Sequence, residues 1–455
     1  MSHIGEFELI GRISASVNVP QGVTGIGDDC AIIPQHSGLD TLVTTDLLIE
    51  DRHFLLSDVT PEQLGWKSAA VNISDIAAMG GRPVASFLSI ALPKGLDAEW
   101  VDRFIAGFRE LSGRFGVPLL GGDTSASPDK LFINVTVLGE CPHGQAVLRS
   151  GARPGDLICV TGFLGDSAAG LKLVLERAGG NQHPVQGLAP ADLRSAHPSV
   201  PLGPTIPLHP QGTGGVPPET PCLDKLWWAP PVHVATGGHG SPGPAPAPAD
   251  ILVRRHYLPV PRIKLGQQLA ALPGVHAMMD ISDGIASDLR HILNASAAST
   301  VANRARSNFT PDTLPGNMRL APLNGTLPCK VPTSELDLAQ MSMDSGQVSA
   351  LGAEIDLKAL PLSEELQQVC KERGWDAAEL AVSGGEDYEL LFTAAPGTPL
   401  PESCTVIGRI VDSGSEPGMR CEEPGTTDGG PRTKNGGPAI RWIGSDKDFK
   451  GFTHF

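Results

Sequence analysis

Aspartate recurs along this chain in short clusters flanked by glycine, threonine or serine. Five such clusters spread over most of a chain are hard to explain as surface charge. Mg²⁺ in proteins is usually shared between a few carboxylates and the phosphates of a substrate. The pattern therefore indicates a magnesium-dependent phosphoryl-transfer enzyme. The clusters are Gly25-Ile26-Gly27-Asp28-Asp29, Thr44-Thr45-Asp46, Ser74-Asp75, Gly121-Gly122-Asp123-Thr124 and Asp280-Ile281-Ser282-Asp283-Gly284.

Glycines beside these clusters would let backbone N–H groups approach a phosphate closely. Gly121 and Gly122 stand directly before Asp123, and a peptide with two glycines can present its amides to an anion. The stretch 162–170 has a similar glycine-rich form, which is only weakly specific. The sequence contains no Walker A motif, no protein-kinase signature and no dinucleotide fingerprint. Magnesium, rather than a phosphate-loop lysine, would then neutralise the developing charge.

Composition excludes several classes of function. The chain has 455 residues, of which 18% are charged, and a formal net charge of −16. This length predicts two or three domains, and the acidity argues against a nucleic-acid-binding surface. The eight cysteines form no Cys-x-x-Cys pair, which favours free thiols. No signal peptide or membrane-spanning apolar run is evident, so we expect a cytoplasmic protein with no membrane partner.

Strands and helices alternate where the pattern is regular. Residues 40–46, 131–138, 157–161 and 277–280 are predicted strands. Residues 97–115 form a predicted amphipathic helix with Asp97 as its N-cap, and a helix is also expected over 285–294 after the last aspartate cluster. The N-terminus of that last helix could bind a phosphate.

The predicted helix over 61–79 carries one of the aspartates. Trp66, Ala69, Ala70, Ile73 and Ala77 share one side of it and form a core stripe. Ser68, Asn72 and Asp75 lie on the opposite side among apolar residues. A solvated stripe would normally carry longer charged side chains, so this pattern favours a carboxylate aimed into a closed site.

Three irregular segments interrupt the regular pattern, at 182–250, 297–351 and 412–438. The first is crowded with proline and glycine and is expected to be a flexible loop; its Trp227-Trp228 pair is more simply an accidental aromatic pair than a docking spot. Loops of this length are unusual in a compact domain. We therefore interpret all three as insertions into a regular scaffold.

A set of motifs in a fixed order resembles bacterial thiamine-monophosphate kinase. The resemblance covers residues 1–180, 250–296 and 352–455, and the three insertions have no counterpart in it. The motifs begin at Gly25 (Gly-Ile-Gly-Asp-Asp-Cys-Ala), Thr44 (Thr-Thr-Asp-Leu), His53 (His-Phe), Val71 (Val-Asn-Ile-Ser-Asp-Ile-Ala-Ala-Met-Gly-Gly), Gly121 (Gly-Gly-Asp-Thr), Arg149 (Arg-Ser-Gly-Ala-Arg-Pro-Gly-Asp), Asp280 (Asp-Ile-Ser-Asp-Gly), Ser383 (Ser-Gly-Gly-Glu-Asp-Tyr-Glu-Leu) and Asp448 (Asp-Phe-Lys-Gly-Phe-Thr-His-Phe).

The resemblance implies an α/β (α+β) chain with the two-domain fold of aminoimidazole ribonucleotide synthetase. Residues 1–143 would be the N-terminal domain and 144–455 the C-terminal domain, with the insertions inside the second. The N-terminal mixed sheets of two subunits would pair to form a homodimer. The implied reaction is the ATP-dependent phosphorylation of thiamine monophosphate to thiamine diphosphate, by direct in-line transfer over a cluster of Mg²⁺ ions.

The same resemblance assigns roles to residues that match the family's motifs, and it assigns none of them as a general base. The implied magnesium ligands are Asp29, Thr44, Thr45, Asp46, Asp75, Asp123, Asp280 and Asp283. The implied ATP contacts are Gly122, Asp123, Arg149 and Ser282. The implied contacts to thiamine monophosphate are His53, Glu386 and Phe449.

Simpler interpretations stay open at the sequence level. Arg149 could form a surface salt bridge, His53 could be a structural imidazole, and Phe449 could be a core aromatic. For the whole protein, one alternative is another ATP-dependent synthetase of the same superfamily, acting in hydrogenase maturation, selenophosphate synthesis or purine synthesis. A second alternative is a non-catalytic scaffold whose insertions bind partners; aspartates in every cluster argue against it.

Overall fold

The computed structural model describes residues 22–24, 28–35, 38–179, 246–308, 351–412 and 439–451. The account below concerns the unit formed by residues 1–176 and 248–455. Most of the expected insertions, with the Trp227-Trp228 pair, lie outside the described residues, as does Gly25-Ile26-Gly27. Within the described part no helix has the length and apolar character needed to cross a membrane. The cysteines described there are free thiols.

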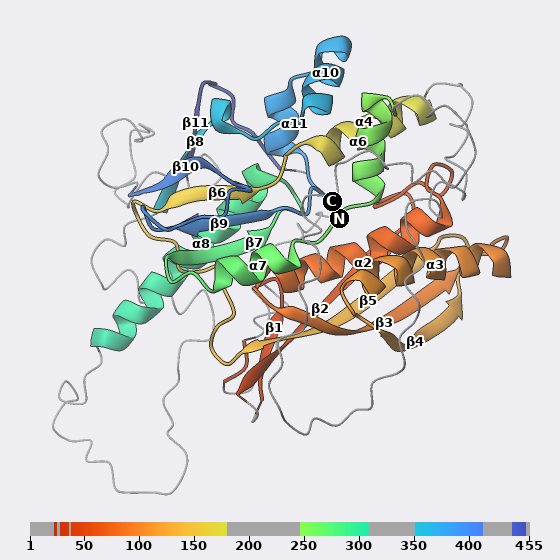
Figure 1. The fold of residues 1–455 in the computed structure, drawn as a ribbon, viewed down its shortest axis with the longest axis horizontal. Coiled ribbons are helices and arrows are strands. Elements are labelled where there is room, and N and C mark those ends of the chain that lie inside the picture. Colours follow the sequence, from red (N-terminus) through yellow and green to blue (C-terminus); the bar gives the residue numbers. More distant parts are fainter. Residues whose placement is uncertain are drawn as a thin grey trace, which may run out of the picture. The chain divides into compact units, whose positions relative to one another are not determined.

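The first sheet is mixed and has the strand order β1-β2-β5-β3-β4 (Figure 1). Its strands are β1 (Ala31–Pro34), β2 (Leu39–Ile49), β3 (Arg82–Leu92), β4 (Leu119–Ala126) and β5 (Phe132–Pro142). All neighbouring pairs are antiparallel except β3 and β4, which are parallel. The predicted strands are confirmed, the first (40–46) within β2 and the second (131–138) within β5 except for Leu131, which precedes it. The Gly121-Gly122 pair lies within β4.

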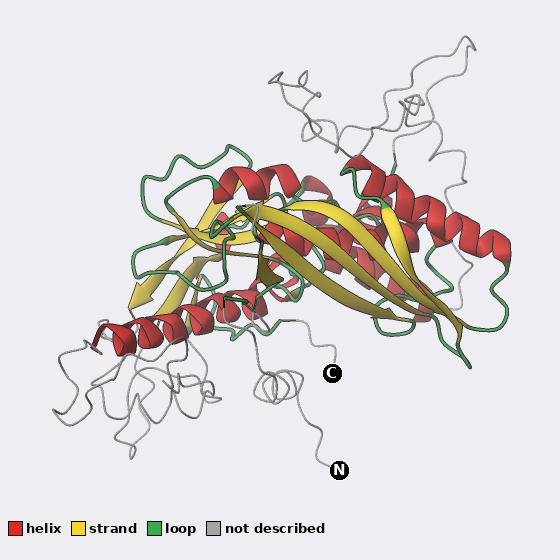
Figure 2. Cartoon of the chain, turned by 90° about the horizontal axis from the view of Figure 1, so that it is seen from below, coloured by secondary structure: helices red, strands yellow, loops and turns green. Residues whose placement is uncertain are grey.

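Two of the described helices belong to this half of the chain. Helix α2 (Pro61–Ala78) begins at a capping box in which Thr60 and Gln63 exchange hydrogen bonds. Helix α3 (Ala98–Arg114) begins at Asp97, whose side chain accepts from Trp100 N–H as expected. Helix α2 packs on β2, β3 and β5, and α3 packs on α2. Figure 2 shows the opposite face of this sheet with no described helix over it.

The second sheet has the order β11-β8-β10-β6-β9-β7, antiparallel except for β11 beside β8. It contains the two predicted strands at 157–161 and 277–280, and a hydrophobic core lies between it and α8. The mixed α/β fold class is thus as expected. The strands are β6 (Leu157–Thr161), β7 (Val275–Asp280), β8 (Leu351–Asp356), β9 (Leu390–Ala394), β10 (Cys404–Asp412) and β11 (Ile440–Ile443).

The described helices of the second half include one that is longer than expected. Helix α8 runs over Ile285–Asn308 and so continues past residue 294, into the segment assigned to the second insertion. Its last turns are rich in alanine, which favours helix without a hydrophobic stripe. The others are α4 (Asp166–Gly179), α6 (Pro248–Tyr257), α7 (Ile263–Ala270), the 3₁₀ turn η3 (Leu357–Ala359), α10 (Glu364–Arg373) and α11 (Ala377–Ser383).

Helix α2 connects the two halves because it contacts α6, α7 and β7 as well as the first sheet and α3. This explains why it is buried on almost every side, including the polar side chains of Ser68 and Asn72. Both of those are hydrogen-bonded, Ser68 to Leu64 O and Asn72 to Ser68 O. A solvated polar stripe is therefore excluded. The assignment of residues 1–143 and 144–455 to separate domains stays a prediction.

The close contact between α2 and α3 depends on a glycine. A Cβ added at Gly107 would lie 1.9 Å from the backbone oxygen of Glu62, so the helices would have to move apart. We expect Gly107→Ala to lower the free energy of unfolding by about 1–3 kcal/mol. Gly113→Ala, on the same helix with nothing within 4 Å, should instead raise it by up to about 1 kcal/mol. Equal unfolding free energies in urea for the two variants would contradict this packing account.

Candidate active site

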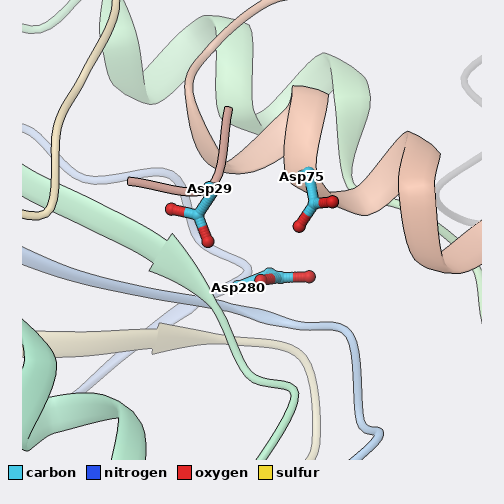
Figure 3. Close-up of side chains that lie close together, drawn as sticks. All are labelled: Asp29, Asp75 and Asp280. Carbon is cyan, nitrogen blue, oxygen red and sulfur yellow. The ribbon is translucent and has the colours of Figure 1, made fainter. Parts of the chain in front are cut away.

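Three aspartates from distant parts of the chain meet at one point (Figure 3). Asp29 lies just before β1, Asp75 near the end of α2, and Asp280 at the end of β7. One carboxylate oxygen of each lies within 4.8 Å of the others. We call these three residues the acidic cluster. The adjacent Asp28 is not part of this cluster; its carboxylate accepts from the backbone N–H of Arg149 at 2.7 Å.

Hydrogen bonds from neighbouring elements hold the acidic cluster in place. The Thr44 hydroxyl donates to Asp75 Oδ2 at 2.5 Å, which ties β2 to α2. The Ser74 hydroxyl donates to Asp280 Oδ2 at 2.6 Å, which ties α2 to the second sheet. Asp46 N–H donates to Asn72 Oδ1 at 3.0 Å. Two of the aspartates are therefore fixed by partners on other elements rather than by their own loops.

The carboxylates of this region repel one another in the folded protein. Burial, and then the charge of Asp29, raise the pKa of Asp280 to about 8 and that of Asp46 to about 6. Burial, and then Asp46 and Asp280, raise the pKa of Asp75 well above its usual range. Buried groups of one sign need a cation to stay ionised together. The arrangement therefore favours a positively charged ligand.

Arg149 supplies one protein cation to this region. Its guanidinium donates to both carboxylate oxygens of Asp29, at 2.7 Å and 3.2 Å. Burial alone would lower the pKa of Arg149, but the adjacent Asp29 more than reverses this and raises it. A fork-like guanidinium can also bind a phosphate. The structure thus places Arg149 beside the acidic cluster, and its contact with ATP stays a prediction.

The donor set fits a hard divalent cation. Octahedral Mg²⁺ binds oxygen at about 2.0–2.1 Å, so its ligand atoms lie within roughly 4.2 Å of one another. The oxygens of the acidic cluster, within 4.8 Å of one another, need only small shifts to reach this spacing. No sulfur or imidazole belongs to the cluster, and carboxylate oxygens alone suit Mg²⁺, Ca²⁺ or Mn²⁺.

Thr45 faces away from the acidic cluster. Its hydroxyl accepts hydrogen bonds from Asn134 and Thr136 on β5, on the face of the sheet opposite to Thr44 and Asp46. Side chains alternate between faces along a strand, which explains the difference between adjacent threonines. Only the backbone of Thr45 could reach a metal held by the acidic cluster.

Gly122 and Asp123 lie apart from the acidic cluster within one chain. Both are exposed on β4 at the edge of the first sheet. The register pairs Asp123 with Ser89, Ser89 with Asn134, and Asn134 with Leu47. The side chain of Asp123 therefore lies on the same face of the sheet as those of Ser89, Asn134 and Leu47, which is the face away from α2. The expected convergence holds for Asp29, Asp46, Asp75 and Asp280, and it fails for Asp123 within a single chain.

Ser282 and Asp283 lie in the loop between β7 and α8, just after Asp280 of the acidic cluster. Ser282 O accepts from Glu386 N–H at 2.8 Å. Asp283 N–H donates to Asp288 Oδ2 at 3.2 Å. Asp288 was not expected from the sequence; it is buried, and its other oxygen has no hydrogen-bond partner within the described residues. The metal and ATP roles of Ser282 and Asp283 stay predictions.

The residues expected to contact thiamine monophosphate have different surroundings. His53 Nδ1 accepts from Ile49 N–H at 2.9 Å, which is a structural contact. Glu386 has a left-handed backbone (φ 64°) and pairs with Lys67. Phe449 is buried in the core of the second half, with its ring edge-on to Trp442. A substrate contact for each stays a prediction, which this placement of Phe449 does not favour.

The glycine-rich stretch at 162–170 uses its amides internally. Asp387 accepts hydrogen bonds from Gly165 N–H and Ser167 N–H at 2.8 Å and 3.2 Å. The first turn of α4 is therefore capped by a carboxylate of the same chain. A phosphate could bind to these amides only by displacing Asp387. The glycine-rich sequence here therefore serves the packing of the chain rather than phosphate binding.

The sequence relates this chain to known proteins. Residues 27–141 match the family model described as AIR synthase related protein, N-terminal domain. The chain is 33% identical over 295 residues to thiamine-monophosphate kinase of Bacillus subtilis, covering 65% of this chain and 71% of that protein. The chain belongs to the thiamine-monophosphate kinase family. It is also 30% identical to the Escherichia coli (strain K12) enzyme of that family over 86% of this chain and 82% of the relative.

Solved structures of the thiamine-monophosphate kinase family share the fold. A structure described as "AaThiL complexed with AMPPCP and TMP" superposes with a TM-score of 0.61 at 26% identity, covering 99% of this chain and 97% of that one. Thiamine monophosphate kinase from Aquifex aeolicus gives a TM-score of 0.56 at 26% identity, covering 90% and 94%. The expected aminoimidazole ribonucleotide synthetase-like fold is confirmed.

Proposed function

We propose that this chain transfers the terminal phosphoryl group of ATP to thiamine monophosphate, forming ADP and thiamine diphosphate at the acidic cluster. The observation that carries the proposal is the meeting of Asp29, Asp75 and Asp280 beside the guanidinium of Arg149. Membership of the thiamine-monophosphate kinase family supports it. A structure related to this chain is described as a complex with AMPPCP and TMP, which supports binding of both substrates.

The residues present explain what the protein itself contributes. In the transfer, an oxygen of the thiamine phosphate forms a bond to the γ-phosphorus as the bond to the ADP oxygen breaks. A phosphate ester is already largely ionised at neutral pH, so its oxygen needs no general base. Asp29, Asp75 and Asp280, with Asp46 beside them, would hold several Mg²⁺ ions, which supply positive charge against the phosphates. Thr44, Ser74 and Arg149 keep the carboxylates oriented.

One assay tests the proposed reaction directly. Purified protein with ATP, Mg²⁺ and thiamine monophosphate should form thiamine diphosphate and ADP in equal amounts. Thiamine should not be phosphorylated, because it lacks the phosphate oxygen that attacks. Absence of the diphosphate, or comparable turnover of thiamine, would contradict the proposal. The expected cytoplasmic location stays a prediction that this assay does not address.

We also propose that the active form is a homodimer in which two copies meet through the uncovered face of the first sheet. Leu47 and Phe87 are 50% and 36% exposed on this face, and Leu120 on edge strand β4 is 63% exposed. Apolar side chains grouped on one sheet face are typical of an interface. Asp123 belongs to the same face by register, so a second copy would place Asp123 at the interface and offer it to the partner's acidic cluster.

Mixing two inactive variants tests this arrangement. Asp75→Asn and Asp123→Asn should each be nearly inactive alone. After subunit exchange half of the dimers are mixed, and one of their two sites is complete, so activity should recover to about a quarter of the wild-type value. No recovery in a mixture that light scattering shows to be dimeric would contradict a contribution from the partner's Asp123. A monomeric, fully active protein would contradict the dimer itself.

A further inference from the structure

A buried lysine lies opposite one of the expected substrate-binding residues. Lys67 is in the middle of α2 with an exposed fraction of 0%, and it is one of the largest fully buried side chains in the described part of the chain. Lysine is almost never fully buried unless it is paired. Its Nζ donates to Glu386 Oε2 at 3.0 Å. This ion pair joins residues that are far apart in the sequence.

The Lys67–Glu386 ion pair and the acidic cluster both involve one face of α2. Lys67 and Ser74 are about two helical turns apart and so share one face of α2. Ser74 donates to Asp280 of the acidic cluster, while Lys67 donates to Glu386. One helix face therefore contacts both the Asp280 carboxylate of the acidic cluster and the Glu386 carboxylate.

The backbone around Glu386 is also closely held. Glu386 N–H donates to Ser282 O, and Tyr388 N–H donates to Ile281 O, at 2.8 Å and 3.0 Å. A Cβ added at Gly385 would lie 2.2 Å from Ser282 O. The segment that carries Glu386 thus lies directly against the loop that follows Asp280, and Glu386 adopts a left-handed φ of 64°. A non-glycine residue in this conformation persists only where its surroundings hold it.

His256 also lies near Glu386 but interacts with it more weakly than Lys67 does. His256 Nδ1 is 3.5 Å from Glu386 Oε2 but 3.0 Å from Ser167 Oγ. A separation of 3.5 Å is long for a hydrogen bond, so His256 pairs chiefly with Ser167. Burial, and then the charge of Lys67, lower the pKa of His256 to about 3. The imidazole is therefore neutral at physiological pH, whereas Lys67 Nζ donates to Glu386 Oε2 at the shorter distance of 3.0 Å.

Building on the proposed function, we propose that Lys67 is a positioning residue, which holds the Glu386 carboxylate on the same face of α2 as the acidic cluster, about two helical turns away, so that it can bind thiamine monophosphate. A buried ion pair is seldom retained for stability, because its desolvation cost offsets most of the attraction. An orienting role explains why a lysine is present inside α2. Without Lys67 the Glu386 carboxylate would lose this charged partner and the orientation that the pair gives it, and the affinity for thiamine monophosphate would fall.

Kinetics and direct binding of the Lys67→Met variant test this role. We expect the KM and the dissociation constant for thiamine monophosphate to rise at least about tenfold, a loss typical of supporting hydrogen-bond partners. The KM for ATP should change less than about threefold, because Lys67 orients Glu386 and not the ATP phosphates. Lys67→Arg, which keeps the charge, should recover part of the affinity.

A double-mutant cycle separates positioning from a general structural effect. Lys67→Met should add no further loss of affinity in a Glu386→Gln background, because the group that Lys67 orients is already changed. The double variant also has no unpaired buried charge, so it should fold if Lys67→Met alone does not. Glu62→Gln is a matched control, because it breaks the Glu62–Arg103 ion pair at the start of the same helix and should leave the affinity unchanged.

The outcomes distinguish this inference from the proposed function. If the wild-type protein fails to phosphorylate thiamine monophosphate, the proposed function is wrong. If the wild-type protein is active and Lys67→Met binds thiamine monophosphate normally, the positioning role is wrong. Additive losses in the cycle, or a large rise in the KM for ATP, would also overturn it, since they would indicate an independent contact.

Discussion

Replacing Asp75 with asparagine should lower kcat by about 100- to 1,000-fold without unfolding the protein, the size of effect seen when one well-placed electrostatic group is removed from an active site. Asp75 is the member of the acidic cluster that α2 carries, and Thr44 donates to its carboxylate. Asparagine can still accept that hydrogen bond but lacks the charge needed to hold Mg²⁺. Steady-state kinetics at saturating ATP and Mg²⁺ would measure the loss.

The same substitution should have the opposite effect on stability. In the metal-free protein, burial and the charges of Asp46 and Asp280 disfavour the ionised form of Asp75. Removing this carboxylate removes repulsion, so the melting temperature of the metal-free variant should equal or exceed that of the wild type. Asp102→Asn, at an exposed position on α3, should change neither quantity. Loss of activity together with a lower melting temperature would indicate a structural role for Asp75.

Removing divalent metal should abolish turnover, and Mg²⁺ should restore it with an affinity that rises with pH. The pKa of Asp280 is raised to about 8 and that of Asp46 to about 6, in both cases by burial first and by Asp29 second. Mg²⁺ binds the ionised carboxylates, so protons compete with the metal below these values. Titration of the chelated enzyme with Mg²⁺ at several pH values would measure this.

The stability of the metal-free protein should change with pH in the opposite direction to the Mg²⁺ affinity. Between about pH 4 and 8 the folded protein binds more protons than the unfolded chain, because folding raises the pKa values of Asp280 and Asp46. The melting temperature without metal should therefore fall as the pH rises through this window. The increase produced by Mg²⁺ should be larger at pH 8 than at pH 5. A Mg²⁺ effect that is independent of pH would contradict the assignment of these residues as ligands.

The sequence predicted the acidic cluster well because the aspartates stand at the ends of elements. Asp280 closes a strand, and Asp75 lies on a helix whose polar residues are too small for a solvated face. Placement of Asp123 could not be predicted in the same way. Whether it meets the other aspartates depends on strand order and on register, and three strand pairings separate it from β2.

Other features depended on contacts that a single element does not reveal. Thr44 and Thr45 look equivalent in the sequence, yet the strand alternation places them on opposite faces. Lys67 has no motif of its own, and its role becomes visible only when α2 lies against the segment that carries Glu386. Likewise, the amides at the start of α4 have the form of a phosphate site, but Asp387 already caps them. In each case the position or role of the residue depends on tertiary contacts, which the local sequence does not reveal.

A crystal structure with Mn²⁺ and a non-hydrolysable ATP analogue would test the central claim most directly, because Mn²⁺ can replace Mg²⁺ at oxygen sites and is visible by anomalous scattering. We expect an anomalous peak between Asp29, Asp75 and Asp280, within about 2.2 Å of a carboxylate oxygen of each. Bound nucleotide with no metal at these three carboxylates, or metal held only elsewhere, would contradict the account.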